Sequence, residues 1–237
     1  MKLQTLLMGA ALLFVATACS KDEPEPKPNP KPGTDPEAPA EVKQITFSAT
    51  EYGTWTYIDL KSGKTEVLGV KGPWVYKQQN NEGQMEEAYT KDMAENTEEP
   101  KELKDWQLAF HRFEPKTNMG EVVETTETEL SKVTEVPTSG FEADTEVKEK
   151  IIVDAKNMMM GHIGYAKTAF VNLTLYKWLK RTPTGGMPPY EYSLSGKVYI
   201  LKCKDGQYYK LKFTDYMSQE GQKGVITFSY SPIKMKK

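Results

Sequence analysis

Polar and apolar side chains alternate along much of the chain after residue 42, and this pattern predicts strands. In residues 44–49 every second side chain is apolar, which is the period of a strand that buries one face. Residues 54–59 and 65–68 continue the alternation on either side of Lys61-Ser62-Gly63-Lys64. Because a glycine in a short connection favours a tight turn, we expect a hairpin here, followed by a further strand at residues 74–76.

The second half of the chain carries the same signals. Residues 197–202 and 208–213 flank Asp205-Gly206, a strong hairpin signal, and residues 224–230 predict a closing strand. Residues 125–134 and 146–153 alternate more weakly, and we expect strands there as well. The sum is an all-β fold, a single domain of consecutive antiparallel hairpins.

An aromatic segment in the middle of the chain predicts one more strand. Trp106, Leu108 and Phe110 occupy alternate positions, which places the aromatic rings on one face. His111 lies on the second face of this strand and is one of two histidines in the chain. It is therefore either a candidate ligand or a polar neighbour that hydrogen-bonds to the backbone.

Composition and charge mainly exclude functions. The chain has 237 residues with 31 basic and 33 acidic side chains, a net charge of -2 that gives no reason to propose a nucleic acid partner. Residues 77–102 are polar and acidic, and we expect a long surface loop or a short helix over residues 84–94. Cys203 is predicted to lie in a strand as a buried small hydrophobe, and no disulfide framework is implied.

The first 41 residues differ from the rest in composition. Residues 1–18 have a positive start, a short apolar middle and small residues before Cys19, which predicts a cleaved secretory signal. The small residues before Cys19 resemble a bacterial lipobox, which implies lipid on that cysteine. Prolines alternate with polar residues through residues 19–41, as is typical of an extended tether. The folded domain is expected at residues 42–237.

Two groups of methionines are the strongest candidates for chemistry. Met158, Met159 and Met160 are consecutive, and Met187 lies between two glycines and two prolines. A methionine cluster is often plain core, because the side chain is a flexible gap-filler. A loop of Gly and Pro, however, is neither helix nor mid-strand, and a thioether on such a loop can bind a soft metal or the iron of haem.

Several separated motifs resemble one protein family. Residues 105–112 read Asp-Trp-Gln-Leu-Ala-Phe-His-Arg and are followed by Thr117-Asn118. Together with the C-terminal hairpins they resemble the HmuY-like haem-binding lipoproteins of Bacteroidota. The resemblance covers most of residues 44–230, and its further motifs are residues 54–57, 136–141, 192–199, 210–216 and 223–230.

The resemblance implies haem binding without catalysis. In the founding member two histidines from two loops ligate the haem iron, and those loops correspond here to residues 157–164 and 185–189. This chain departs from that pattern, because Met187 stands in the second loop and the methionine triplet lies in the first. The departure implies a subgroup in which two thioethers hold the iron.

Three methionines are candidates for the axial iron ligand that the first loop supplies. If the segment is extended, Met158 and Met160 share one face and Met159 faces the other. We rank Met158 first, Met160 second and Met159 third, and a mixed pair of His162 and Met187 stays open. A thioether is neutral and favours ferrous iron, so we expect tighter binding of reduced haem. It does not protonate near neutral pH, so we also expect little loss of binding at mildly acid pH.

Other side chains near these loops are candidates for contact with the porphyrin ring and its propionates. Flat apolar area suits a porphyrin, although ordinary sheet packing is the simpler account of each aromatic residue taken alone. Lys156 and Lys167 are candidate partners of the propionates, or else solvated lysines. The aromatic candidates are Tyr190, Tyr165, Phe170, Tyr176 and Trp178.

The resemblance also implies a location and partners. It predicts a lipid-anchored protein of the outer membrane, at the cell surface or released as a soluble form. Its expected partners are an outer-membrane TonB-dependent haem receptor, host haem proteins and further copies of the chain. The acidic residues after Cys19 resemble a surface-export signal of Bacteroidota lipoproteins, or are simply a solvated linker.

Two other functions compete with haem binding. Aromatic-rich hairpins also suit a β-rich surface lipoprotein that binds glycan or protein without haem. An enzyme is disfavoured, because the sequence has no serine nucleophile elbow, no metal-spaced His/Cys set and no phosphate loop. We therefore expect a binding protein without enzymatic activity.

Overall fold

The computed structural model describes residues 40–93, 96 and 99–233. The predicted signal peptide, Cys19 and the tether as far as residue 39 lie outside these residues. Residues Pro39–Lys237 form one compact unit that holds all three hydrophobic clusters of the described chain. This body therefore carries its own core, and we expect it to fold without the leader and tether. None of the described helices is long and apolar enough to cross a membrane.

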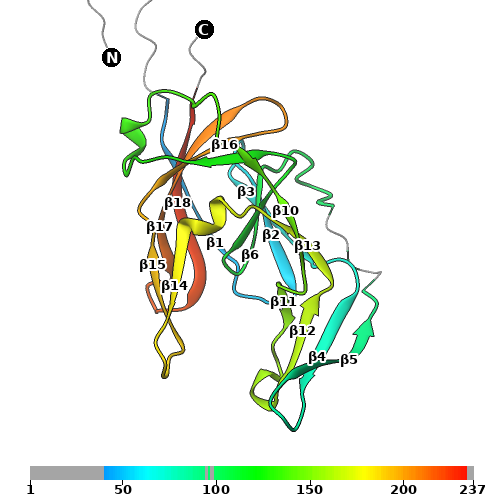
Figure 1. The fold of residues 1–237 in the computed structure, drawn as a ribbon. Helices are drawn as coiled ribbons and strands as arrows, with labels where there is room; N and C mark the ends of the chain where they lie inside the picture. Colours follow the sequence, from blue (N-terminus) through cyan, green and yellow to red (C-terminus); the bar gives the residue numbers. More distant parts are fainter. Residues whose placement is uncertain (1–39, 94–95, 97–98, 234–237) are drawn as a thin grey trace, which may run out of the picture. The chain divides into compact units, whose positions relative to one another are not determined.

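The largest sheet of the body has six antiparallel strands and contains both ends of the described chain (Figure 1). The first strand pairs with the last, with Ile45 opposite Phe228, so residues far apart in sequence lie side by side at one edge of the sheet. The strands, in spatial order, are β1 (Lys43–Ser48), β18 (Lys223–Ile233), β17 (Tyr208–Met217), β16 (Val198–Lys202), β8 (Glu121–Glu124) and β9 (Glu142–Ala143).

Two four-stranded antiparallel sheets and two isolated strand pairs complete the described body. One sheet has the order β3 (Lys64–Gly69), β2 (Thr54–Asp59), β6 (Leu108–His111) and β7 (Glu114–Thr117). The other has the order β11 (Ile152–Asp154), β12 (His162–Ala166), β4 (Trp74–Gln79) and β5 (Met85–Lys91). The pairs are β10 (Thr145–Lys148) with β13 (Thr168–Val171), and β14 (Leu179–Pro183) with β15 (Tyr190–Leu194).

Strands β2 and β6 are buried on both faces. On one face Ile58 and Phe110 pack with Phe213 of the six-stranded sheet. On the other face Tyr57 and Ala109 join a second cluster, with side chains from β4, β11, β12 and β13. Successive side chains of these strands therefore point into two different hydrophobic clusters. Neither face of the strands is a polar surface exposed to solvent.

The alternation in residues 106–111 differs in detail from the prediction. Strand β6 begins at Leu108, and Leu108 and Phe110 belong to the first cluster. Trp106 lies before the strand and packs against the second cluster, so the aromatic rings do not share one face. His111 is 1% exposed, and its two ring nitrogens are hydrogen-bonded.

Three other local expectations are wrong. The acidic stretch forms strand β5, in which every residue is exposed, and not a loop or a helix. Residues 125–134 form no strand, and their one regular element is the 3-10 helix η1 (Leu130–Lys132). Cys203 lies just after β16; it is buried as expected, and burial raises the pKa of its thiol to about 12. The predicted hairpins at residues 54–68 and 197–213 are both present.

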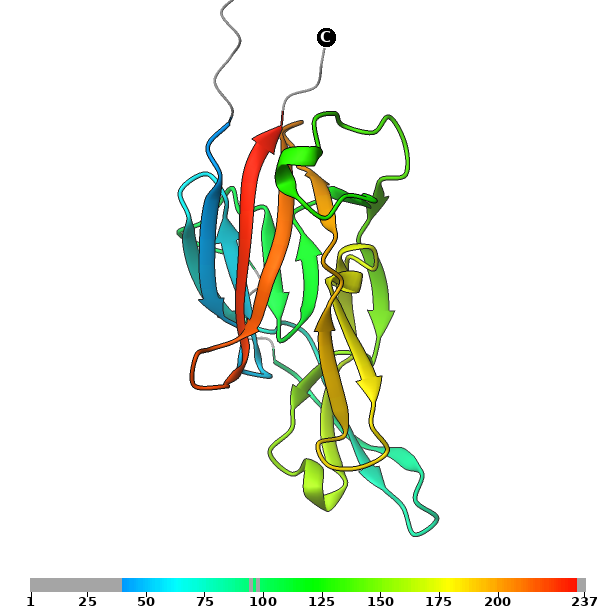
Figure 2. The same ribbon diagram turned by 90° about the vertical axis from the view of Figure 1, so that its left-hand side faces the viewer.

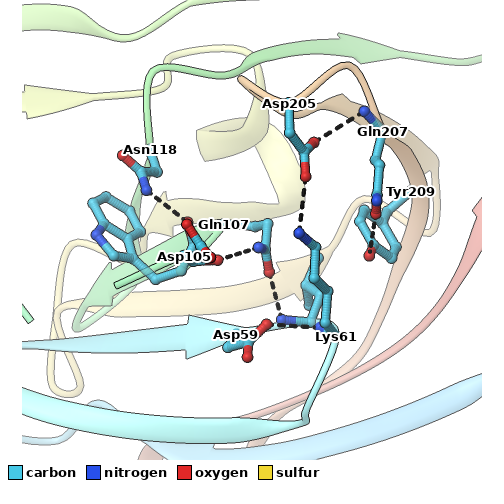
Figure 3. A network of polar contacts seen from close by, with 10 residues as sticks. Asp59, Lys61, Asp105, Gln107, Asn118, Asp205, Gln207 and Tyr209 are labelled. Carbon is cyan, nitrogen blue, oxygen red and sulfur yellow. Dashed lines mark hydrogen bonds and ion pairs between the residues drawn. The ribbon is translucent and has the colours of Figure 1, made fainter. Parts of the chain in front are cut away.

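A polar network connects the turn after β2 with the turn between β16 and β17 (Figure 3). Lys61 Nζ donates to Asp205 Oδ2 at 2.9 Å, and the backbone nitrogen of Leu60 donates to Gln107 Oε1 at 2.6 Å. The Lys61 ammonium lowers the pKa of the Asp205 carboxyl below its usual range. Lys61 and Asp205 are both partly exposed, so solvent screens this ion pair and it adds little stability. We assign the network to the fold, because none of these four residues lines the cavity described next.

Candidate ligand-binding site

A cavity of about 700 Å³ is lined by the β6–β7 turn, by residues of β11 and β12, and by the β14–β15 hairpin. This volume lies within the usual range of small-molecule sites, about 300–1,000 Å³. In both ribbon views the β14–β15 hairpin and the short turn before β12 extend toward the same end of the body (Figures 1 and 2). Most lining side chains are aliphatic or aromatic.

The β6–β7 turn brings a histidine, an arginine and a phenylalanine to the cavity. His111 Nε2 lies 2.5 Å from the carbonyl oxygen of Tyr52, and its Nδ1 lies 3.2 Å from Glu114 Oε2. Both nitrogens are therefore engaged, which assigns His111 to the packing of the turn and not to iron ligation. Arg112 follows with a φ of +54°, a left-handed backbone that residues other than glycine rarely adopt.

The β14–β15 hairpin forms a second wall of the cavity. The Arg181 guanidinium lies 4.2 Å above the Phe113 ring and 5.4 Å from the Tyr190 ring. Its Nη2 also donates to the Tyr176 hydroxyl at 3.1 Å. These stacked contacts hold the base of the hairpin against the β6–β7 turn.

The methionine triplet forms a short 3-10 helix, η2 (Met158–Met160), so the case of an extended segment, in which Met158 and Met160 would share one face, does not apply. Met158 is half-buried and lines the cavity. Met159 and Met160 are 96% and 74% exposed and do not line it. The helix ends at Gly161, whose φ of +73° and 2.9 Å approach to Gln79 Cβ leave no room for a side chain.

The structure separates the two other candidate ligands from the cavity lining. His162 is half-buried at the start of β12, where it pairs with Gln78 of β4. Met187 is 89% exposed in the loop that connects β14 and β15. Thr184 organises this loop, because its Oγ1 accepts from the nitrogen of Gly186 at 3.2 Å and donates to the carbonyl oxygen of Pro188 at 2.5 Å.

The predicted porphyrin contacts fall into two groups. Tyr190 and Tyr176 line the cavity. Trp178 is fully buried in the core, Tyr165 lies beneath the Lys77 ammonium at 5.6 Å, and Phe170 reaches a different cavity. That second cavity, about 820 Å³ in volume, contains none of the candidate iron ligands.

The charged side chains at the cavity are mostly cationic, and sequence reasoning missed them. Arg112, Lys150 and Arg181 line it, whereas the predicted Lys156 and Lys167 do not. Glu114 is the acidic residue of the lining, and it contacts His111. The positive φ of Arg112 and the stacking of Arg181 depend on tertiary structure, so no sequence pattern marks these two residues.

Burial favours the neutral form of two tyrosines in the cavity lining. Desolvation raises the pKa of Tyr176 and of Tyr192 above the ordinary value for a phenol, against the opposing effect of the Arg181 charge. Phenolate ligation of iron is therefore disfavoured at these positions. In the described residues no group of three or more His, Cys, Asp or Glu side chains forms a metal site. The Met158 thioether is thus the candidate iron ligand within the lining.

The described body is an antiparallel all-β fold with a cavity lined by aromatic and cationic side chains. Its sequence matches the HmuY protein family over residues 51–230. The chain belongs to the HmuY family, a family of haem-binding type.

Solved structures of similar proteins share the fold. The apo HmuY analogue of Tannerella forsythia is 35% identical, with a TM-score of 0.71 over 83% of this chain and 97% of that one. Apo PinO of Porphyromonas gingivitis is 30% identical, with a TM-score of 0.72 over 84% and 100%. A putative HmuY-like haem-binding protein of Bacteroides vulgatus is 32% identical, with a TM-score of 0.63 over 82% and 93%. No curated protein matches the chain.

Proposed function

We propose that the chain binds haem in the 700 Å³ cavity, with Met158 and Met187 as the axial ligands of the iron. The observation that carries this proposal is the position of Met158. It is the member of the triplet that lines the cavity, and Tyr190 of the hairpin that carries Met187 lines the same cavity. The family and its similar structures support haem as the ligand.

The lining fits the chemistry of haem. Tyr176, Tyr190 and Phe113 offer flat apolar area for the porphyrin, and a thioether is a recognised axial ligand of haem iron. Arg112 and Arg181 supply positive charge for the propionates. Bound haem would supply an iron atom with open axial positions, and the protein's part is to hold and shield the ring.

Met187 lies outside the lining, so its role requires the loop to close over the ligand. A side chain added at Gly185 or Gly186 would meet no atom within 4 Å, which means that this part of the loop is unpacked. Closing the loop would therefore displace no packed side chain there. We infer that Met187 completes the iron site after haem has entered.

We further propose that the protein is a surface haem carrier. Lipid on Cys19 would anchor it to the outer membrane, and the proline-rich tether would hold the body away from the lipid. The body would then pass haem to an outer-membrane TonB-dependent receptor. The sequence before residue 42 and the family support this arrangement.

An absorption titration of the body, residues 42–237, with haem tests the proposal. We expect saturable one-to-one binding with a change in the Soret band. Met158→Ala should weaken binding about tenfold or more, equivalent to ~1.4 kcal/mol or more. Met159→Ala is the matched control, because Met159 has the same chemistry but is 96% exposed and away from the lining.

Three outcomes would contradict parts of the proposal. Equal losses in Met158→Ala and Met159→Ala would remove the specific role of Met158. Binding unchanged by Met187→Ala would remove Met187 as a ligand. An absence of saturable binding in the wild-type body would defeat haem binding altogether, and glycan or protein partners would then be tested.

A further inference from the structure

We propose that the cavity recognises the carboxylates of its ligand through Arg112 and Arg181, and that the protein therefore also captures iron-free porphyrins that carry carboxylates. This inference rests on the proposed function of the cavity, but it does not depend on iron ligation. In this proposal the protein selects its ligand by the negative charge of the carboxylates and not by the metal.

Arg112 is held in an unfavourable backbone conformation at the cavity. It is the first residue of the two-residue turn between His111 and Glu114, with a φ of +54°. Glycine is the residue that ordinarily occupies such a position. Met119 and Glu149 share this conformation elsewhere in the body, but Arg112 is the one of the three that lines the cavity, and strained backbone tends to cluster at functional sites. The position of Arg112 therefore points to a role for its guanidinium.

The guanidinium of Arg112 is fixed in place and retains a buried donor. It lies 4.6 Å above the Tyr52 ring, and its Nη1 donates to the carbonyl oxygen of Thr50. Its Nε is buried and has no hydrogen-bond partner among the described residues. A buried donor without an acceptor is costly, so a ligand oxygen that reaches it would gain a charge-assisted hydrogen bond.

Arg181 supplies a second positive charge from the β14–β15 hairpin. Stacking on Phe113 and Tyr190 and the hydrogen bond to the Tyr176 hydroxyl fix the plane of its guanidinium. Arginine presents five N–H donors in a fork that matches a carboxylate. Arg181 thus lies where an aromatic ring and an acid group of one ligand can be bound together.

The balance of charge favours an acidic ligand. The cavity is lined by Arg112, Arg181 and Lys150, and its acidic member, Glu114, is in contact with His111. Of the candidate iron ligands, Met158 alone lies in the lining. The aromatic and cationic side chains of the lining do not depend on a metal, so they should retain a porphyrin that has no metal.

The test compares two metal-free probes, protoporphyrin IX and its dimethyl ester, by quenching of tryptophan fluorescence in the body. We expect protoporphyrin IX to bind saturably, more weakly than haem because it makes no bond to the thioethers, and its ester to bind about tenfold more weakly than the acid. Arg181→Gln should weaken binding of the acid about five- to tenfold and leave binding of the ester unchanged. Lys167→Gln, a lysine outside the cavity, should change neither.

Arg112→Gly provides a second variant that tests recognition apart from folding. Glycine accepts the left-handed backbone without strain, so we expect the variant to fold and to show a normal circular dichroism spectrum. Its affinity for protoporphyrin IX should fall toward that of the ester. This result would separate the role of the side chain from that of the turn.

Equal wild-type affinities for the acid and the ester would overturn the inference. So would haem binding without binding of protoporphyrin IX, and that result would leave the iron ligation by Met158 and Met187 intact. Failure of all three ligands would instead defeat the proposed function of the cavity. Each outcome therefore assigns the failure to one of the two proposals.

Discussion

The thioether of Met158 lies at the cavity because of one short turn of 3-10 helix. Neighbouring side chains on such a turn point in different directions, which leaves Met159 and Met160 in solvent. On the sequence alone Met158 also ranks first, but Met160 ranks second on the condition of an extended segment, in which these two side chains would share one face. The three side chains have the same chemistry, so the sequence could not distinguish them without the backbone.

His162 lies two residues after the end of this helix, and it provides a prediction. It is half-buried in the β12–β4 pairing and does not line the cavity. We expect His162→Ala to change haem affinity by less than about twofold and to leave the Soret spectrum unchanged. A spectral shift in His162→Ala, measured beside Met158→Ala, would move the iron ligand from Met158 to His162.

Buried tyrosines predict how stability depends on pH. Desolvation raises the pKa of Tyr199 to about 12, so the folded state holds this proton more tightly than the unfolded state does. The stabilising contribution is complete below about pH 10 and is lost as the pH rises toward 12. Alkaline titration followed by circular dichroism should therefore show unfolding in this range.

Tyr199→Phe removes that ionisation, and its alkaline unfolding midpoint should move to higher pH. The change also removes the contact of the Tyr199 hydroxyl with Ser195 Oγ at 3.1 Å, which should cost about 1 kcal/mol at neutral pH. Tyr89→Phe on the exposed strand β5 is the control and should leave the midpoint in place. Identical midpoints in wild type and Tyr199→Phe would refute the assignment.

Among the structural elements, the β14–β15 hairpin is the one on which the proposed iron site depends, because it carries Met187. Its loop is organised by the Thr184 hydroxyl, which contacts both Gly186 and Pro188. We expect Thr184→Val to loosen the loop and weaken haem binding by about three- to tenfold, with little change in the free energy of unfolding.

Thr182→Val is the matched control for the loop. Thr182 is exposed on β14, pairs with Glu191, and lies outside both the loop and the cavity lining. Isothermal titration with haem should show normal affinity for this variant. Equal affinities in Thr182→Val and Thr184→Val would mean that the order of the loop is irrelevant to binding.

Elements that bury a face could be predicted from the sequence, and elements without a buried face could not. The hairpins of β2 with β3 and β16 with β17 show clear alternation and turn glycines, and both were expected. Strand β5 exposes every residue, so backbone pairing with β4 holds it and no hydrophobic period reveals it. The weak alternation of residues 125–134 was misleading, because that segment covers β16 through Val133 and Leu130 without forming a strand.

At the scale of the whole molecule, local alternation predicts the class of fold but not how the sheets combine. Trp55, Tyr57 and Ile58 are all fully buried in one strand, because β2 lies between two hydrophobic clusters. The cavity arises where the β14–β15 hairpin and the β11–β12 region meet the β6–β7 turn. These segments are distant in sequence. The family resemblance pointed to the loops at residues 157–164 and 185–189 as ligand loops, whereas the presence of Arg112 and Arg181 at the cavity is seen only in the structure.

The central claim is that thioethers hold the iron of a bound haem. The most direct test is the affinity of the body for ferric and for dithionite-reduced haem, measured by absorption titration in wild type and Met158→Ala. We predict tighter binding of ferrous haem by wild type, because a soft neutral sulfur prefers the reduced iron, and loss of most of this preference in Met158→Ala. Equal wild-type affinities for the two oxidation states would contradict the claim.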